Sequence, residues 1–377
     1  MTDRRLRTRG QPAAVRAIES MLASHVPHAL LLVGPDGAGK TTLALDLAMA
    51  LLCRSTDPAN RPCGECRACR AVAHGNHPDL HRLGPSGAGW VIPIGGRDEP
   101  GVRGLVADLA LLPVEGGARV AIIEAAHRLT EDAQSALLKT LEEPPAGTTL
   151  ILCADDEERL LPTIRSRCVR LRLGSVGRRD VEAILVDQGA ADAVVAARSA
   201  RLSGGRPGVA LAYAAAPKAA VLRGQIARSL LDLRLASRPA RLAGFRELAG
   251  QAGQLLRELD SGAGKSVSST GVDGDTAEAS GDGRAATRIP AAERRAAALA
   301  LVGIWRDVLR DLAAYELGEP RLVRDVELLD ELEPAAVTMT TDAVAESLRR
   351  LDVAGERLEG NVSPELVLDV LAIHHGR

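Results

Sequence analysis

The stretch LLLVGPDGAGKTTLALDLAMALL, residues 30–52, decides the fold of the N-terminal half of this chain. Its apolar run predicts a buried strand, a glycine-rich turn follows, and apolar residues at helical spacing predict the helix behind the turn. The turn fits the phosphate-loop pattern G-x-x-x-x-G-K-[ST]. In that pattern backbone N–H groups wrap a phosphate, the lysine neutralises its charge and the hydroxyl binds Mg²⁺. The predicted nucleotide-binding residues of the turn are Gly34, Gly37, Gly39, Lys40, Thr41 and Thr42.

The composition indicates a chain with several hydrophobic cores and little net charge. With 377 residues, of which 46% are hydrophobic, two or three domains are expected. The formal net charge is -2, and the aromatic residues are two Trp, two Tyr and one Phe. Neither a basic field nor stacking platforms for single-stranded nucleic acid are therefore expected. The start MTDRRLRTRG has no apolar signal core and no apolar run is long enough to span a membrane, so we expect a cytoplasmic protein.

Short apolar runs alternate with helical patterns over residues 1–173. This alternation predicts an α/β core with a mostly parallel, Rossmann-like sheet and helices on both faces. Beyond it only helical patterns remain, which predict an all-α lid at 174–235 and an all-α C-terminal domain at 236–377. Inside the last domain, residues 261–288 are poor in large apolar side chains and are expected to form a disordered loop. The predicted strands are 29–33, 119–123, 149–153 and 169–173, with a weaker one near Leu80.

Four cysteines follow the phosphate-loop helix with the spacing C-x9-C-x2-C-x2-C. Four thiolates so close in sequence can surround one Zn²⁺ tetrahedrally, and with four sulfur ligands no position stays open for water, so the metal would be structural. One C-x2-C pair could instead act in redox chemistry, but two cysteines would then stay unexplained. His74, His77 and His81 are close enough to replace a ligand, although such histidines are more often packing residues. The predicted metal ligands, which define a zinc module at 53–69, are Cys53, Cys63, Cys66 and Cys69.

The segment EDAQSALLKTLEEPPAGTTLILCADDEERLLPTIRSRC, residues 131–168, resembles the clamp-loader branch of the AAA+ ATPases. The cysteine spacing and the GNHPDL that follows it are similar to the same branch, specifically to clamp-loader subunits of bacterial DNA polymerase III. The resemblance covers residues 10–215 and is weak in the C-terminal third. It implies an AAA+ core, a helical lid and a helical collar domain that joins a ring of subunits.

The resemblance also shows what this chain lacks. In motor subunits of the family, the strand that corresponds to residues 119–123 ends in Asp-Glu. The Asp holds the metal, and the Glu positions the attacking water. Here these positions are Glu124 and Ala125; Glu124 could still serve Mg²⁺, but alanine cannot accept a proton. Asp155 and Asp156 replace a polar sensor, and their charge would repel a terminal phosphate. Gly208 replaces the lid arginine. Hydrolysis of ATP by this chain is therefore not expected, although ATP or ADP with Mg²⁺ could be held.

The SRC motif is retained. By resemblance, Arg167 would reach into the nucleotide site of a neighbouring subunit and act there as a catalytic arginine finger in trans. Arg165 is the second candidate. The alternative is that Arg167 only pairs with a carboxylate on its own surface.

Together these features predict a stator subunit of a five-membered clamp loader. Its implied partners are the gamma/tau and delta subunits of a hetero-pentamer and, through the assembly, the sliding clamp and primer-template DNA. The main alternative is an active gamma/tau-type ATPase motor of the same loader, which Ala125 disfavours. A stand-alone phosphate-loop enzyme and a direct DNA-binding protein are weaker alternatives, because the first does not explain SRC and the second finds no basic stripe.

Overall fold

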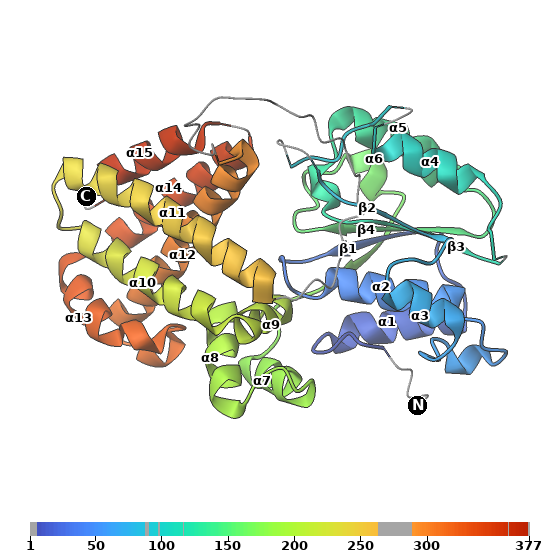
Figure 1. Ribbon diagram of the computed structural model, residues 1–377, viewed down its shortest axis with the longest axis horizontal. Coiled ribbons are helices and arrows are strands. Elements are labelled where there is room, and N and C mark those ends of the chain that lie inside the picture. Colours follow the sequence, from blue (N-terminus) through green and yellow to red (C-terminus); the bar gives the residue numbers. More distant parts are fainter. Residues whose placement is uncertain are drawn as a thin grey trace, which may run out of the picture. The chain divides into compact units, whose positions relative to one another are not determined.

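A computed structural model describes residues 6–86, 90–96, 99–115, 117–262, 289–360 and 362–375. The chain divides into two compact units, shown in Figure 1 and described separately below. Unit 1 comprises Met1–Gln188 with Gly205–Val209, and unit 2 comprises Gly189–Gly204 with Ala210–Arg377. The predicted separation of the helical part into a lid at 174–235 and a collar at 236–377 stays a prediction. The loop predicted at 261–288 lies outside the described residues, except for Ser261 and Gly262.

Unit 1 is built on a five-stranded parallel sheet in the order β2-β3-β4-β1-β5, as the alternating sequence pattern predicted. β1 lies between β4 and β5, with Ala29 opposite Leu150 and Leu30 opposite Val169. Each parallel strand returns to the same edge, so the carboxyl ends of β1, β3 and β4 meet there. The strands are β1 (Ala29–Val33), β2 (Leu80–Leu83), β3 (Arg119–Ile123), β4 (Thr148–Ala154) and β5 (Val169–Arg172).

Helices cover both faces of this sheet, as Figure 1 shows. Successive strand residues point to opposite faces, so Leu30 and Leu32 pack in one core and Leu31 in the other. The first face carries α1 (Pro12–Ala23), α2 (Lys40–Leu52) and α3 (Arg67–Ala73); the second carries α4 (Val102–Ala110), α5 (Glu131–Glu142) and α6 (Pro162–Arg165). The unit also contains η1 (Pro58–Asn60), η2 (Ala126–Arg128) and α7 (Arg178–Asp187).

The α5 helix illustrates how local sequence sets these elements. Thr130 caps its first turn by accepting a hydrogen bond from Ala133 N, and Glu131 and Asp132 lie at the positive end of the helix dipole. Leu137 and Leu141 are fully buried against the sheet. Two prolines beyond the helix end then turn the chain back toward β4.

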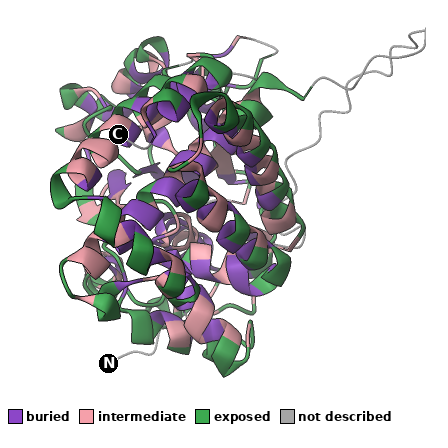
Figure 2. Ribbon diagram, turned by 90° about the vertical axis from the view of Figure 1, so that its left-hand side faces the viewer, coloured by how far each residue is buried: buried purple, intermediate pink, exposed green. Residues whose placement is uncertain are grey.

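Unit 2 is helical throughout its described part. Its longest helix, α12, is packed against α10, α11, α13, α14 and α15, so its large side chains form the centre of the unit. Figure 2 shows buried and exposed residues alternating along the same helices, which is the pattern of amphipathic helices around a core. The helices are α8 (Ala193–Ser203), α9 (Pro207–Ala215), α10 (Pro217–Leu233), α11 (Arg238–Gly262), α12 (Ala291–Glu316), α13 (Leu329–Thr338), α14 (Thr341–Glu359) and α15 (Pro364–His374), with the short η3 (Pro320–Leu322) and η4 (Val326–Leu328). α9 begins in unit 1.

A membrane-spanning helix was not expected, and among the helices of the described residues none combines the length and the apolar character that a bilayer requires.

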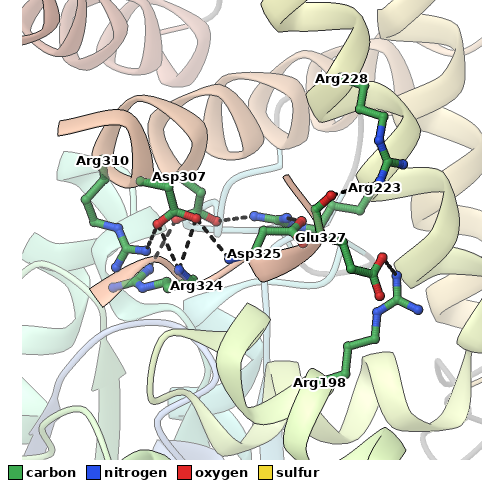
Figure 3. Close-up of polar contacts among 9 residues, drawn as sticks. Arg198, Arg223, Arg228, Asp307, Arg310, Arg324, Asp325 and Glu327 are labelled. Atoms are coloured by element: carbon green, nitrogen blue, oxygen red, sulfur yellow. Dashed lines mark hydrogen bonds and ion pairs between the residues drawn. The ribbon is translucent and has the colours of Figure 1, made fainter. Parts of the chain in front are cut away.

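A network of buried charges joins the segment around η4 to the helices of unit 2 (Figure 3). Arg223 of α10 is only 3% exposed and pairs with Asp307 at 3.0 Å and with Asp325 at 2.9 Å. The buried Asp311 carboxylate accepts hydrogen bonds from the backbone N–H groups of Arg324 and Asp325. Each buried charge thus has a partner, which is the condition for tolerating it in a core.

Replacing Arg223 by Ala should therefore lower the free energy of unfolding by about 3–5 kcal/mol, because Asp325 would lose its cation and Asp307 would keep only Arg324. Urea unfolding followed by circular dichroism measures this loss. The matched control is Arg246→Ala, which removes a largely exposed pair with Asp369 and should leave the midpoint unchanged. A loss for Arg246→Ala as large as that for Arg223→Ala would contradict the assignment.

Three rings form a small cluster in the core of unit 2. The ring centroids of Trp305 and His375 are 4.5 Å apart, and Phe245 lies at 5.2 Å from Trp305. His375 is buried, and its Nε2 donates to Leu230 O at 2.7 Å. Burial lowers the pKa of His375 to about 4, since the charged ring would lose its hydration, and the nearby cation of Arg234 acts in the same direction.

The lowered pKa of His375 predicts a loss of stability in acid. The unfolded ring takes up its proton near pH 6.5 while the folded ring does not until about pH 4. Stability is therefore complete above pH 6.5 and falls as the pH drops toward 4, by about 3 kcal/mol in total. Urea unfolding at pH 7 and pH 5, followed by Trp305 fluorescence in a Trp90→Phe background, should show this fall. His375→Phe should unfold with the same free energy at both pH values. If this variant lost as much stability between pH 7 and pH 5 as the wild type, protonation of His375 would not be the cause of the loss.

Candidate functional site

The predicted phosphate loop runs from the carboxyl end of β1 into α2. Gly34 N donates to Ala154 O of the adjacent β4 at 3.2 Å, and a Cβ on Gly34 would stand 2.2 Å from Leu173 O. Gly39 has a φ of 102°, a backbone conformation that residues other than glycine rarely adopt. Both glycines are therefore required by the path of the loop. Thr41 and Thr42 follow in the first turn of α2, where both are half-buried.

Lys40 is held by three oxygens of its own chain. Its ammonium donates to Gly34 O at 2.8 Å and to Pro35 O at 2.9 Å, and it pairs with Asp155 Oδ1 at 2.7 Å. Only 7% of the lysine side chain is exposed. Asp155 follows β4 directly, so the strand order brings it beside the loop.

Glu124, the predicted Mg²⁺ ligand, is also engaged. Arg82 of β2 donates its Nε to Glu124 Oε1 at 2.7 Å, and its Nη2 donates to the same oxygen. Sequence reasoning missed Arg82, because an arginine in a short, half-buried strand carries no motif; the parallel pairing of β2 with β3 is what places it there. The next residue, Ala125, has a φ of 52° and offers a methyl group where motor subunits have a carboxylate.

The start of α9 lies against the phosphate loop within unit 1. Gly208 N donates to Gly37 O at 2.9 Å, and a Cβ on Gly208 would be 3.1 Å from Gly37 Cα. A Cβ on Gly37 would in turn be 2.9 Å from Val209 Cγ2. The lid arginine predicted to be missing at position 208 is thus replaced by a close backbone contact. The sequence also did not indicate Gln11, whose Nε2 donates to Gly174 O at 2.7 Å and to Ala38 O at 3.2 Å.

The four predicted metal ligands come together in one cluster: the sulfur atoms of Cys53, Cys63, Cys66 and Cys69 all lie within 4.8 Å of one another. Backbone N–H groups of Cys66 and Cys69 point at the sulfurs of Cys63 and Cys66, each at 3.4 Å. Such donors stabilise thiolates, the form that binds metal. The cluster could hold a metal ion, and its all-sulfur ligand set fits Zn²⁺.

The environments of the four thiols differ. Hydrogen bonds from the N–H groups of Glu65 and Cys66 lower the pKa of Cys63 to about 6. Burial raises the pKa of Cys69 far above its ordinary value. Since all four ligands must be deprotonated, metal binding releases protons and is weakened in acid.

His77, one of the histidines near the cluster, has structural partners instead. Buried His77 accepts a hydrogen bond from Asp79 N at Nδ1, and its Nε2 lies 3.7 Å from Glu115. Asp79 accepts from Val114 N at 2.7 Å and from Glu115 N at 2.9 Å, so the GNHPDL segment supports the loop between α4 and β3. His77 is therefore a packing residue.

Arg167, the predicted arginine finger, lies just beyond α6. Its Nη1 donates to Thr163 O at 2.8 Å, and its Nη2 pairs with Glu142 of α5. One third of the side chain is exposed. Arg165 pairs with Glu158 at 2.7 Å. The predicted arginine is thus on the surface, and its partner is an exposed carboxylate of the same chain.

Comparison with known proteins agrees with this geometry. Residues 10–176 match the family model described as DNA polymerase III, delta subunit. Over this segment the chain is similar to the delta prime subunits of bacterial clamp loaders.

Two delta prime subunits illustrate the similarity. The chain is 44% identical over 143 residues to DNA polymerase III subunit delta' of Pseudomonas aeruginosa. The aligned segment covers 38% of this chain and 42% of that protein. It is 36% identical over 205 residues to the Escherichia coli subunit, covering 54% of this chain and 59% of that protein. The match therefore spans about half the length of these relatives.

Among solved structures, a DNA polymerase III gamma subunit-related protein from Thermotoga maritima is similar over 97% of this chain and 100% of its own. The identity is 14% and the TM-score 0.40, too low for that likeness to carry an argument. The AAA+ fold of the core is recognised from its sheet order together with the position of the phosphate loop at the end of β1.

Metal analysis of the purified protein should find about one zinc per chain, held by the four cysteines. Cys66→Ser should lose the metal and expose the bonds after Arg54 and Arg67 to trypsin, since the ion braces this segment. Cys168→Ala, which removes a thiol outside the cluster, should keep both zinc and protection. A folded, protease-resistant preparation without metal would exclude this site.

Proposed function

We propose that this protein is a stator subunit of the DNA polymerase III clamp loader. In this function it completes the ring, does not hydrolyse ATP itself, and supplies Arg167 to the nucleotide site of an adjacent ATPase subunit. The ring then loads the sliding clamp onto primer-template DNA. The partners are the gamma/tau and delta subunits of a hetero-pentamer, and the location is the cytoplasm. The similarity of its core to delta prime subunits supports association with clamp-loader subunits.

Ala125 is the residue on which the loss of hydrolysis depends. A water molecule becomes a nucleophile only when a group beside it accepts its proton or orients it. A methyl group can do neither, and the preceding carboxylate, Glu124, is already paired with Arg82. If a nucleotide binds, ATP or ADP with Mg²⁺ would be held by the phosphate loop as a static ligand, with no acid–base group at position 125.

The position of Arg167 supports its role in trans. It lies at the end of a short helix on the surface, where a neighbouring subunit can approach, and its present contact with Glu142 is exposed. Exposed ion pairs contribute little to stability, so exchanging this carboxylate for a phosphate costs little. A guanidinium delivered to a neighbour stabilises the charge that spreads over a transferred phosphoryl group.

The zinc module completes the proposal. Four thiolate ligands leave the ion no open coordination position, so we assign Zn²⁺ a structural role at the junction of α2 and α3. The module would then brace the end of the helix that begins at the phosphate loop.

The alternative is an active gamma/tau-type motor of the same loader. A motor should turn over ATP in isolation and do so faster with primed DNA, whereas the stator should show no turnover above that of a Lys40→Ala control. Robust DNA-stimulated ATPase activity of the isolated chain would favour the alternative. Ala125 and the Arg82–Glu124 pair are the observations that favour the stator.

Arg167→Ala should lower ATP turnover in a loader reconstituted with gamma/tau and delta subunits. At the site next to this chain the loss should approach the ~10³-fold or larger effect of an arginine finger, because the transition-state charge there loses its cation. Steady-state ATPase assays with clamp and primed DNA measure the change. The assembly itself should still form, as judged by size-exclusion chromatography.

Two further variants separate the finger from a structural pair. Glu142→Gln removes the negative charge from the same intramolecular contact but leaves the guanidinium in place, so its loader should turn over ATP like the wild type. Arg165→Ala tests the second candidate and should have a smaller effect than Arg167→Ala. If Glu142→Gln and Arg167→Ala lowered ATP turnover equally, the role of Arg167 would be its structural contact with Glu142 and not that of an arginine finger.

A further inference from the structure

The ammonium of Lys40 has all its hydrogen-bonding capacity in use. A protonated lysine has three N–H donors, and three acceptors surround Nζ: the carbonyl oxygens of Gly34 and Pro35 and the carboxylate of Asp155. The contacts measure 2.8, 2.9 and 2.7 Å. No donor of Lys40 is therefore left for a phosphate unless one of these contacts breaks.

Asp155 is the only one of the three acceptors that carries a charge. With 7% of its side chain exposed, Lys40 needs an anion nearby, because an unpaired buried cation is costly. In a nucleotide-binding loop that anion is a phosphate. Here the chain supplies it, so the loop satisfies its lysine without any ligand.

The position of Asp155 is set by the backbone around it. The end of β4 pairs with the end of β1, with Val33 opposite Ala154, and Asp155 N donates to His127 Nδ1 at 3.2 Å. The carboxylate therefore stands at the edge where the loop begins. Its side chain is 39% exposed, which leaves it screened in part by water.

Glu124, the predicted Mg²⁺ ligand, is also paired with a residue of its own chain. Glu124 accepts two hydrogen bonds from Arg82, so its charge is neutralised by a guanidinium rather than by Mg²⁺. Lys40, which would bind phosphate, and Glu124, which would bind Mg²⁺, are thus both paired within the protein. ATP with Mg²⁺ can therefore be held only if it displaces both of these internal partners.

We propose that Asp155 is an internal counter-ion that takes the place of a nucleotide phosphate on Lys40 and makes the loop select against triphosphates. ATP must displace Asp155 from Lys40 and then place its γ-phosphate beside the displaced carboxylate. ADP has no γ-phosphate and avoids that repulsion. The loop therefore binds ADP more tightly than ATP, and its shape is kept in the absence of either.

This inference deepens the account of the loop in the proposed function, but it needs no partner subunit. It concerns equilibrium binding by the isolated chain, whereas the role of Arg167 is measured in the assembled loader. Normal ATP turnover by an Arg167→Ala loader would thus contradict the proposed role of Arg167 but not the proposed role of Asp155. Conversely, the binding experiment can contradict the role of Asp155 without affecting the role of Arg167.

The test is titration calorimetry of the isolated full-length protein with ADP and with ATP, each with Mg²⁺. Asp155→Asn keeps an oxygen for Lys40 and removes the charge, so its ATP affinity should rise about tenfold, the order expected for one partly screened charge pair. Its melting temperature should also increase more with ATP than that of the wild type, since the nucleotide now supplies the missing anion. Hydrolysis should stay absent, because Ala125 is unchanged.

Asp156→Asn is the matched control. It removes the same charge one residue away, on a carboxylate that lies 3.7 Å from Arg159 and has no contact with Lys40, so it should raise ATP affinity much less than Asp155→Asn does. An equal rise for both variants would mean that general charge, not the contact with Lys40, sets the affinity, and would overturn the proposal. So would wild-type protein that binds ATP as tightly as ADP, a result that requires no variant to fold.

Discussion

A buried ammonium must be neutralised, and in this protein the contact between Lys40 and Asp155 does so. The contact joins the first residue of α2 to the residue that follows β4. It lets a glycine-rich loop keep its shape with no ligand, because backbone oxygens and a carboxylate satisfy every donor of the lysine. A loop that in motor proteins responds to nucleotide is here part of the fixed framework.

The surroundings of the loop show the same tendency. Arg82 neutralises Glu124, and Gly208 approaches Gly37 so closely that no side chain fits between them. Together these contacts replace a metal-binding carboxylate and a lid arginine with interactions inside the chain. These contacts are the basis for proposing a subunit that stays in one state. Arg167, the proposed arginine finger, takes part in an exposed ion pair with Glu142.

The helical unit depends on buried charge for a different purpose. Arg223, Asp307 and Asp325 connect α10 and α12 with the segment leading into η4, and Asp311 fixes the backbone of that segment. Replacing such networks by apolar residues often costs nothing in stability, so their use here favours specificity of the helix arrangement. In the same unit, Phe245 and Trp305 pack around a neutral His375.

The sequence by itself determined the elements whose signals are local. Apolar periodicity and the glycine pattern predicted β1, the phosphate loop and α2, and the spacing of four cysteines within one short segment predicted their cluster. It also identified Ala125 and Asp155 as departures from the motor pattern. What it could not supply is which distant charges meet. Arg82 and Glu124 are 42 residues apart, and Arg223 and Asp325 are 102 apart, so only the strand order and the helix packing bring them together. The reason is physical: an ion pair depends on distance in space, which a sequence pattern conveys only within a helix turn or a strand pair.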